Sequence, residues 1–319
     1  TLRKILWINE DTMNNIDYQK IFLEITAELE GIDDVGEVAS YIPELGKVDP
    51  SKLGIHLMTV DKTGYSLGDS NEKFSIQSIA KVLSLTLALK IMGKDMWCRV
   101  GVEPSGSAFN SLVQLENEKG IPRNPFINAG AIVVCDILVS CLQNPKVELL
   151  DFIRKTSGID TVKYCPEVAD SEKKTGYRNY ALTYFMKSFG NIHNDVDVVL
   201  DLYFHLCSIE MTCKELTQTF LFLAYAGVNP ITNVRVISPE RSKRINSVMQ
   251  MCGFYDEAGE FAFKTGLPGK SGVGGGIIAV HPGQFCIAVW SPKLNVNGNS
   301  YKGMKVLEAL TSKTQSSIF

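Results

Sequence analysis

The sequence predicts an α/β protein built from two lobes, a sheet lobe flanked by helices and an all-helical lobe. Segments with strand patterns lie toward the two ends of the chain, and a long series of helical patterns separates them. The sheet is therefore expected to combine both ends of the chain, with the helical lobe as an insertion. Because ligands commonly bind between two such lobes, we expect the functional site in the cleft.

The first part of the chain alternates between helix and strand patterns. Residues 16–30 carry apolar side chains at helical spacing, which predicts an amphipathic leading helix. Residues 53–61 and 65–68 are short alternating runs on either side of a turn containing Gly64, which predicts a hairpin. Residues 78–92 are apolar on most sides of a helix, so we expect that helix to be buried.

The middle of the chain is helical by pattern, and strand patterns almost vanish there. The helices predicted in it are 129–142, 147–156, 180–189, 195–208, 212–226 and 238–251. Strand patterns return at 276–280 and 285–290, before a helical pattern at 301–313. We therefore expect one domain, 1–319, consisting of a leading helix at about 16–30, a sheet lobe at about 31–75 and 255–319, and a helical lobe at about 93–250.

The composition favours a globular protein that acts on a small polar substrate. The 319 residues are 45% hydrophobic, and their formal net charge is −3. Without a basic excess we expect no nucleic-acid partner and no binding to an anionic membrane surface. The longest uncharged apolar stretch falls short of the roughly 20 residues of a membrane-spanning helix, so no membrane partner is expected.

The eight cysteines favour a reducing compartment. Their spacing never forms a CxxC pair, so no metal site is expected, and in a chain of this length they are typical of scattered thiols. Their even number leaves a disulfide framework as the alternative. The N-terminus has no apolar segment of the kind found in signal peptides. Together these features predict a cytoplasmic protein. The cysteines are Cys98, Cys135, Cys141, Cys165, Cys207, Cys213, Cys252 and Cys286.

Two short motifs that resemble functional signatures stand in the wrong context. Residues 64–68 match the GxSxG pattern of a nucleophile elbow, but a polar run follows where a helix should begin, so Ser66 is interpreted as a strand residue. Residues 267–271 resemble the end of a P-loop. Lys264 occupies the position of the first glycine, and a strand follows, so nucleotide binding is rejected.

A serine three residues before a lysine is the pattern that carries chemistry here, because both side chains then share one helix face. It occurs at Ser70/Lys73, Ser78/Lys81 and Ser171/Lys174. Only Ser78 opens a buried apolar helix, where burial lowers the pKa of a lysine toward that of a general base. The alternative interpretation of Ser78 is a helix N-cap.

Two further elements accompany a Ser-x-x-Lys pair in enzymes that recognise penicillin, a [Ser/Tyr]-x-Asn element and a Lys-[Ser/Thr]-Gly strand. Tyr177-Arg178-Asn179 and Lys270-Ser271-Gly272 supply them in the same order. Lys-Thr-Gly also occurs at three other places, 62–64, 174–176 and 264–266. Only 270–272 runs through glycines into a strand, where the backbone can approach a substrate closely.

Over nearly its whole length the sequence resembles the serine-dependent glutaminases of the β-lactamase-like fold. The segments that carry the resemblance are 38–43 (VASYIP), 77–81 (QSIAK), 103–106 (EPSG), 124–132 (NPFINAGAI), 178–179 (RN), 206–210 (LCSIE), 252–256 (CGFYD) and 268–273 (PGKSGV). The ankyrin repeats that follow this domain in animal relatives are not in the sequence, so it resembles the short bacterial type. The resemblance implies hydrolysis of L-glutamine to L-glutamate and ammonia, and self-association as a dimer or tetramer.

The resemblance also implies a role for individual residues. Ser78 is the implied nucleophile, Lys81 its base, and Tyr255 a proton relay beside them. The residues implied to bind the substrate are Tyr41, Ser78, Asn128, Glu172, Asn179, Tyr203, Tyr255 and Val273. Among them, Ser78 and Val273 supply the backbone N–H groups of the implied oxyanion hole. No cofactor is implied, because acyl transfer to water needs only a nucleophile, a base and an oxyanion site.

The chemistry of free glutamine agrees with these implied roles, although each residue has an ordinary structural alternative. The α-ammonium group needs an acidic partner such as Glu172, and the α-carboxylate needs donors such as Asn128 and Asn179. Taken alone, Asn128 is also typical of a helix N-cap and Glu172 of a solvated charge. Tyr41, Tyr203 and Tyr255 are equally compatible with amphipathic packing residues.

Two other functions remain open from the sequence. A β-lactamase or D,D-peptidase would use the same serine–lysine pair on a lactam or a cell-wall peptide, and the lack of an export signal disfavours it. A non-catalytic amino-acid-binding or scaffolding protein could retain the fold without turnover. Ammonia release from glutamine would distinguish the glutaminase from both.

Overall fold

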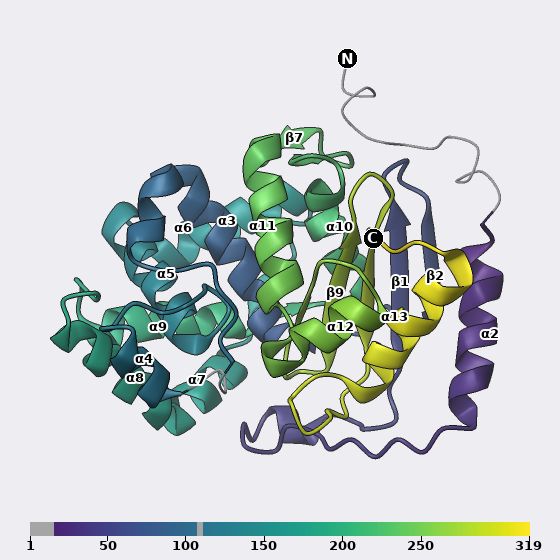
Figure 1. Ribbon diagram of the computed structural model, residues 1–319, viewed down its shortest axis with the longest axis horizontal. Helices are drawn as coiled ribbons and strands as arrows, with labels where there is room; N and C mark the ends of the chain where they lie inside the picture. Colours follow the sequence, from purple (N-terminus) through teal and green to yellow (C-terminus); the bar gives the residue numbers. More distant parts are fainter. Residues whose placement is uncertain (1–15, 107–110) are drawn as a thin grey trace.

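The computed structural model describes residues 16–106 and 111–319 and has an antiparallel sheet on one side and a group of helices on the other (Figure 1). Five strands pair in the order β2-β1-β10-β9-β8. Their bounds are β1 Gly54–Thr59, β2 Gly64–Gly68, β8 Gly269–Ser271, β9 Gly276–His281 and β10 Phe285–Trp290. Two strands come from the first quarter of the chain and three from the last, which confirms the expectation that the sheet combines both chain ends.

Both faces of the sheet are buried, because alternate residues of its central strands enter two different cores. Ile55 and Ile287 belong to a core that also contains residues of α2 (Tyr18–Glu30), α12 (Ala258–Lys264) and α13 (Tyr301–Thr314). Met58 and Ala288 join the larger core on the opposite face, where α10 (Cys213–Ala224) lies against β1, β9 and β10. Figure 1 shows α2 and α13 on one side of the sheet and α10 on the other.

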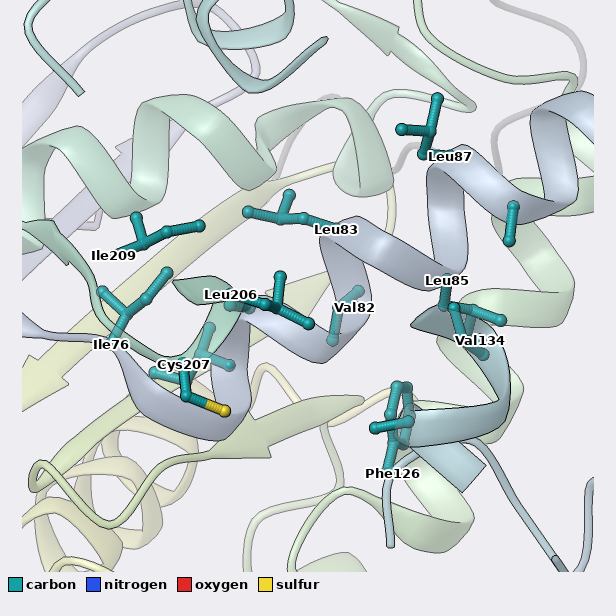
Figure 2. Close-up of a cluster of buried hydrophobic side chains, with 14 of the residues drawn as sticks. Ile76, Val82, Leu83, Leu85, Leu87, Phe126, Val134, Leu206, Cys207 and Ile209 are labelled. Carbon is teal, nitrogen blue, oxygen red and sulfur yellow. The ribbon is translucent and has the colours of Figure 1, made fainter. Parts of the chain in front are cut away.

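The helical lobe surrounds a central buried helix, α3 (Ala80–Met92), which packs against α5 (Asn128–Cys141) and α9 (Val196–Cys207). Every residue of α3 from Ala80 to Leu89 is buried, as predicted from its apolar pattern. Figure 2 shows Val82 and Leu85 of α3 among the side chains of its neighbours. The other helices of this part are α4 Leu112–Asn117, α6 Pro145–Ser157, α7 Pro166–Thr175 and α8 Tyr177–Ser188.

Local sequence explains where several helices begin and end. Thr212 and Glu215 form a capping box at the start of α10. Ser238 caps α11 (Pro239–Cys252), whose first residue is a proline with no N–H to satisfy. Gly158 ends α6 in the left-handed conformation that glycine adopts without a steric cost.

Most of the predicted elements are confirmed, including the leading helix, the β1–β2 hairpin and the last helix. Between 93 and 250, where strand patterns almost vanish, the described residues form four short strands. These are β4 Lys163–Tyr164, β5 Ile209–Met211, β6 Val228–Asn229 and β7 Val234–Arg235. With only two or three residues each, they are too short to show an alternating pattern.

Part of the range that we assigned to the helical lobe packs against the sheet lobe. The range 93–250, assigned to the helical lobe, contains α10, which packs on the sheet, and α11, which contacts β8 and α12. The expectation of a single domain, 1–319, stays a prediction. Within the described residues no single helix is long and apolar enough to cross a membrane, although α5 and α6 meet that test together across a 102° bend.

Candidate active site

Ser78 lies in η3 (Gln77–Ile79), a single 3₁₀ turn between the short strand β3 (Phe74–Ser75) and α3. Ser78 is 8% exposed, and the N-cap residues of η3 and α3 are Ile76 and Ile79, so the N-cap interpretation of Ser78 is wrong. The preceding residue, Gln77, has φ of 49°, in the left-handed region that non-glycine residues rarely adopt. Such backbone strain concentrates at functional sites, where surrounding contacts maintain it.

A glycine-rich segment after β8 lies against the backbone of this turn. A Cβ atom on Gly272 would lie 2.5 Å from the carbonyl oxygen of Ile76 and 3.3 Å from the nitrogen of Ser78. A Cβ atom on Gly274 would overlap the carbonyl oxygen of Ser75. Only glycine permits this close approach, and it brings the main chain of Val273 beside Ser78.

Lys81 lies one helical turn after Ser78 and is buried, with 1% of its surface exposed. Its Nζ donates hydrogen bonds to the carbonyl oxygen of Phe126 at 3.2 Å and to Oδ1 of Asn128 at 2.8 Å. Burial lowers the pKa of Lys81 to about 8, because a desolvated ammonium group is unfavourable. A substantial fraction of its side chains is therefore neutral near physiological pH.

Tyr255 is the first residue of η5 (Tyr255–Glu257), and its side chain reaches Ser78. Like Gln77, it has a left-handed backbone, with φ of 54°. Its hydroxyl group hydrogen-bonds the side chains of Ser78 and Ser271. Burial raises the pKa of Tyr255 to about 12, so the phenol keeps its proton at neutral pH. Lys270, which is completely buried, places its Nζ 4.4 Å from the centre of the tyrosine ring.

Ser78 opens into a pocket of about 360 Å³ between the lobes. All eight residues expected to bind substrate line it, namely Tyr41, Ser78, Asn128, Glu172, Asn179, Tyr203, Tyr255 and Val273. Lys81 is buried and contacts this lining through its hydrogen bond to Asn128. Of the eight, Glu172 comes from α7, Asn179 from α8 and Tyr203 from α9.

The acidic residue of the pocket is buried, so its interpretation as a solvated surface charge is wrong. Glu172 is 8% exposed, and burial raises its pKa to about 7, against the opposing effects of a hydrogen bond from Gln77 and the charge of Lys81. Nearby, Nδ2 of Asn128 donates to Oδ1 of Asn179 at 3.0 Å. The pocket therefore offers one ionisable acid beside an ordered pair of amides.

Sequence reasoning missed several residues of the lining. They are Ile42, Gln77, Thr175, Gly176, Arg178 and Cys207. Gln77 and Arg178 could have been found because they are next in sequence to the predicted site residues Ser78 and Asn179. Gln77 hydrogen-bonds Glu172 and has a left-handed backbone, and no sequence pattern indicated either feature. The described residues contain no group of three or more His, Cys, Asp or Glu side chains that could hold a metal ion.

Comparison with known proteins identifies the family. The family model for glutaminase matches residues 36–319. A glutaminase of Saccharophagus degradans is 72% identical over 307 residues, which cover 96% of this chain and 100% of that protein. A glutaminase of Christiangramia forsetii is 55% identical, with 95% of this chain and 100% of that protein covered.

Solved structures agree with the sequence comparison and confirm the predicted fold class. The probable glutaminase ybaS superposes with a TM-score of 0.89 at 34% identity, over 95% of this chain and 99% of that one. A probable glutaminase from Bacillus subtilis complexed with 6-diazo-5-oxo-L-norleucine has a TM-score of 0.85 at 30% identity, over 96% and 98% of the two chains. With the family model covering most of its length, this chain belongs to the glutaminase family.

Proposed function

We propose that the protein hydrolyses the side-chain amide of L-glutamine to L-glutamate and ammonia through an acyl-enzyme on Ser78. The observation that carries the proposal is the position of Ser78 at the pocket wall, one helical turn from a buried lysine. A serine hydroxyl is a weak nucleophile until an adjacent base accepts its proton. Lys81 supplies that base.

The hydrogen bonds of Lys81 favour its action as a base. A neutral amine has two N–H donors and one lone pair. The carbonyl oxygen of Phe126 and Oδ1 of Asn128 accept from Nζ, which accounts for both donors of the neutral form. The remaining lone pair is then available for the proton of Ser78 as its Oγ attacks the side-chain carbonyl carbon of glutamine.

The oxyanion formed by this attack needs donors that are already in place. We assign the backbone N–H groups of Ser78 and Val273 to this role. The close packing of Gly272 on the turn that carries Ser78 supports the assignment, because it brings the two segments of main chain together. Such donors stabilise charge that develops in the transition state without reorganisation.

In the remaining steps, the proton taken from Ser78 passes to the leaving nitrogen, and water then releases the product. Collapse of the oxyanion breaks the carbon–nitrogen bond, and the departing nitrogen takes the proton from Lys81, directly or through Tyr255, and leaves as ammonia. A water molecule, deprotonated by the neutral Lys81, then attacks the ester of Ser78. The products are glutamate and the regenerated hydroxyl group, so the reaction needs no cofactor.

The pocket suits a free amino acid. We assign Glu172 to the α-ammonium group, because an ionised carboxylate is its natural partner. Asn128, Asn179 and Tyr203 supply donors for the α-carboxylate, and the exposed Tyr41 also lines the pocket. A Bacillus subtilis glutaminase, 31% identical with a TM-score of 0.82, forms a covalent complex with 5-oxo-L-norleucine after reaction with 6-diazo-5-oxo-L-norleucine. That compound has the α-amino-acid end of glutamine, and its covalent capture supports a nucleophile in the pocket.

Ammonia and glutamate release from L-glutamine tests the proposed function. The wild-type protein should release both products in equal amounts, with L-asparagine as the comparison substrate. Ser78→Ala should lose turnover and still bind glutamine, while Ser66→Ala, at the exposed serine of β2, serves as the matched control. Turnover that persists in Ser78→Ala would refute the acyl-enzyme, and binding without turnover in the wild type would indicate an amino-acid-binding protein.

We also propose that the protein is cytoplasmic and forms a homo-oligomer, a dimer or a tetramer. All eight cysteines are free, and five of them are buried, which supports a reducing compartment. On α8, Tyr177 and Tyr184 are 81% and 58% exposed and lie seven residues apart, on the same helix face. Light scattering of the wild type and of Tyr177→Ser/Tyr184→Ser tests the oligomer, and a monomeric wild type would refute it.

A further inference from the structure

The turn that carries Tyr255 is held in an unfavourable backbone conformation. With φ of 54°, Tyr255 occupies the left-handed region, where a bulky residue persists only if its surroundings fix it. Its hydroxyl group must also meet that of Ser78, so a small shift of the turn would break the contact. The residues that fix this turn therefore determine where the hydroxyl group of Tyr255 lies.

Asn299 holds the chain on both sides of Tyr255. This asparagine is completely buried, in the loop between β10 and α13. Its Nδ2 donates to the carbonyl oxygen of Phe254 at 3.3 Å and also to the carboxylate of Glu257. Nδ2 of Asn295 donates to the two carboxylate oxygens of Glu257 at 2.9 and 2.8 Å, which anchors the far end of the turn.

These partners fix the orientation of the Asn299 amide. A carbonyl oxygen and a carboxylate can only accept, so Nδ2 must face Phe254 and Glu257. The amide oxygen then faces Ser271, whose Oγ lies 2.6 Å from Oδ1. The carbonyl oxygen of Gly253 is the other acceptor near this hydroxyl group, but it lies 3.4 Å away, so the single proton of Ser271 points to the closer amide oxygen of Asn299. Ser271 is left with lone pairs to accept a hydrogen bond from the hydroxyl group of Tyr255.

We propose that Asn299 is a positioning residue for Tyr255, acting through Ser271 and through the turn 254–257. In the resting enzyme it directs one chain of hydrogen bonds, in which Ser78 donates to Tyr255, Tyr255 to Ser271 and Ser271 to Asn299. The proton of Ser78 turns from Tyr255 to Lys81 when its Oγ attacks the substrate. In this arrangement the oxygen of Tyr255 presents a lone pair to the nucleophile. The inference rests on the proposed function, because it assigns Asn299 and Ser271 to the proton relay at Ser78.

A double-mutant cycle on Ser271 and Tyr255 tests the inference with steady-state kinetics on L-glutamine. Ser271→Ala should lower kcat by about 10-fold to 100-fold and change KM less than about twofold, since the relay acts on chemistry and not on binding. In a Tyr255→Phe background the same change should have an effect below about twofold, because the hydroxyl group that it positions is gone. Ser271→Thr, which keeps the hydroxyl group, should recover most of the lost kcat.

Matched variants separate positioning from general damage to the buried loop. Ser291→Ala removes the hydroxyl group of another completely buried serine in the same lobe and should leave kcat unchanged. Asn299→Asp keeps the shape of the side chain but removes both N–H donors, so kcat should fall about 100-fold. Asn297→Asp adds the same charge at an exposed position of the same loop and should have no effect.

The cycle gives a decisive answer even if Asn299→Asp fails to fold. If Tyr255→Phe lowers kcat and Ser271→Ala does not, or if their effects simply multiply, Asn299 and Ser271 do not act through Tyr255, and the inference is overturned. If Tyr255→Phe alone keeps full activity, the relay assigned to Tyr255 under the proposed function is wrong. A loss in Ser271→Ala that disappears in the Tyr255→Phe background, with rescue by Ser271→Thr, supports the inference.

Discussion

Nζ of Lys81 donates a hydrogen bond to Oδ1 of Asn128 across a distance of 2.8 Å. Nδ2 of Asn128 in turn donates to Asn179, so the amide of Asn128 is oriented with its oxygen toward the lysine. The proposed base and the proposed carboxylate-binding amides therefore form one connected group. A bond of this kind orients the amine of Lys81 in both its charged and its neutral forms.

The pKa of Lys81 predicts how activity depends on pH. An ammonium group cannot accept the proton of Ser78, so kcat/KM should rise as pH increases toward about 8 and level off above it. Lys81→Met, which removes the amine and keeps the length of the side chain, should lower kcat about 1,000-fold or more at every pH. Lys90→Arg, near the exposed end of the same helix, is the control. A profile without a rise between pH 6 and 8 would contradict the proposed base.

Glu172 should control binding more than chemistry. Glu172→Gln removes the negative charge that pairs with the α-ammonium group, so KM should rise about 10-fold to 100-fold with a smaller effect on kcat. Burial raises the pKa of Glu172 to about 7, so in the wild type KM should fall as pH rises through 7. That dependence should vanish in the variant. Glu167→Gln, at an exposed position of α7, should match the wild type.

The packing of Gly272 predicts that no side chain is tolerated there. Gly272→Ala would push its Cβ atom against the carbonyl oxygen of Ile76, and the contact can be relieved only by moving the main chain away from Ser78. We expect kcat to fall about 100-fold, the usual size of the loss when an oxyanion donor is displaced. Gly259→Ala on α12 is the control, because a Cβ atom there meets no atom within 4 Å. Equal activity of the two variants would argue against the assigned oxyanion hole.

The strong periodic patterns of the chain predicted the sheet and the main helices. The β1–β2 hairpin and α3 were predicted because their apolar residues recur at the period of a strand or a helix over many positions. In contrast, α7, which carries Glu172, was missed because its ten residues are mostly polar and show no apolar stripe. The short strands β4 to β7 offered too few residues for any period to appear.

The candidate site was predicted through a resemblance, and its fine geometry was beyond sequence reasoning. The pattern of Ser78 and Lys81 followed from helical spacing and the apolar helix, whereas Glu172 alone had the features of a surface charge. The left-handed backbones of Gln77 and Tyr255 arise from tertiary contacts, so no local pattern indicated them. The link from Asn299 to Tyr255 likewise joins segments that only the folded sheet lobe brings together.

A buried ion pair in the helical lobe predicts a substitution that strongly lowers the stability of the fold. Asp136 is completely buried and accepts hydrogen bonds from Arg99 and from the backbone N–H groups of His193 and Asn194. Asp136→Asn leaves Arg99 without its anion and should lower the free energy of unfolding by about 3 kcal/mol, measured with urea. Asp151→Asn, in an exposed pair, should cost less than about 1 kcal/mol.

The same pair predicts the response of stability to acid. Burial opposes ionisation of Asp136, but hydrogen bonds from Arg99 and Asn194 outweigh it and lower the pKa. The stabilisation is therefore present above the pKa of an unfolded aspartate, about 4, and is lost as pH falls through the lower folded value. The difference in the free energy of unfolding between the wild type and Asp136→Asn should stay constant from pH 7 to about 4 and narrow as pH falls further. A difference that does not narrow below pH 4 would contradict the assignment.

The most direct test of the proposed nucleophile is covalent labelling with 6-diazo-5-oxo-L-norleucine, followed by peptide mapping. Glutaminase activity should be lost in step with the formation of one adduct per chain, located on Ser78, and no adduct should form in Ser78→Ala. L-Glutamine should protect the site by competition. An adduct on another residue, such as Cys207 in the pocket lining, or full inactivation of a protein whose Ser78 stays unmodified, would show that Ser78 is not the nucleophile.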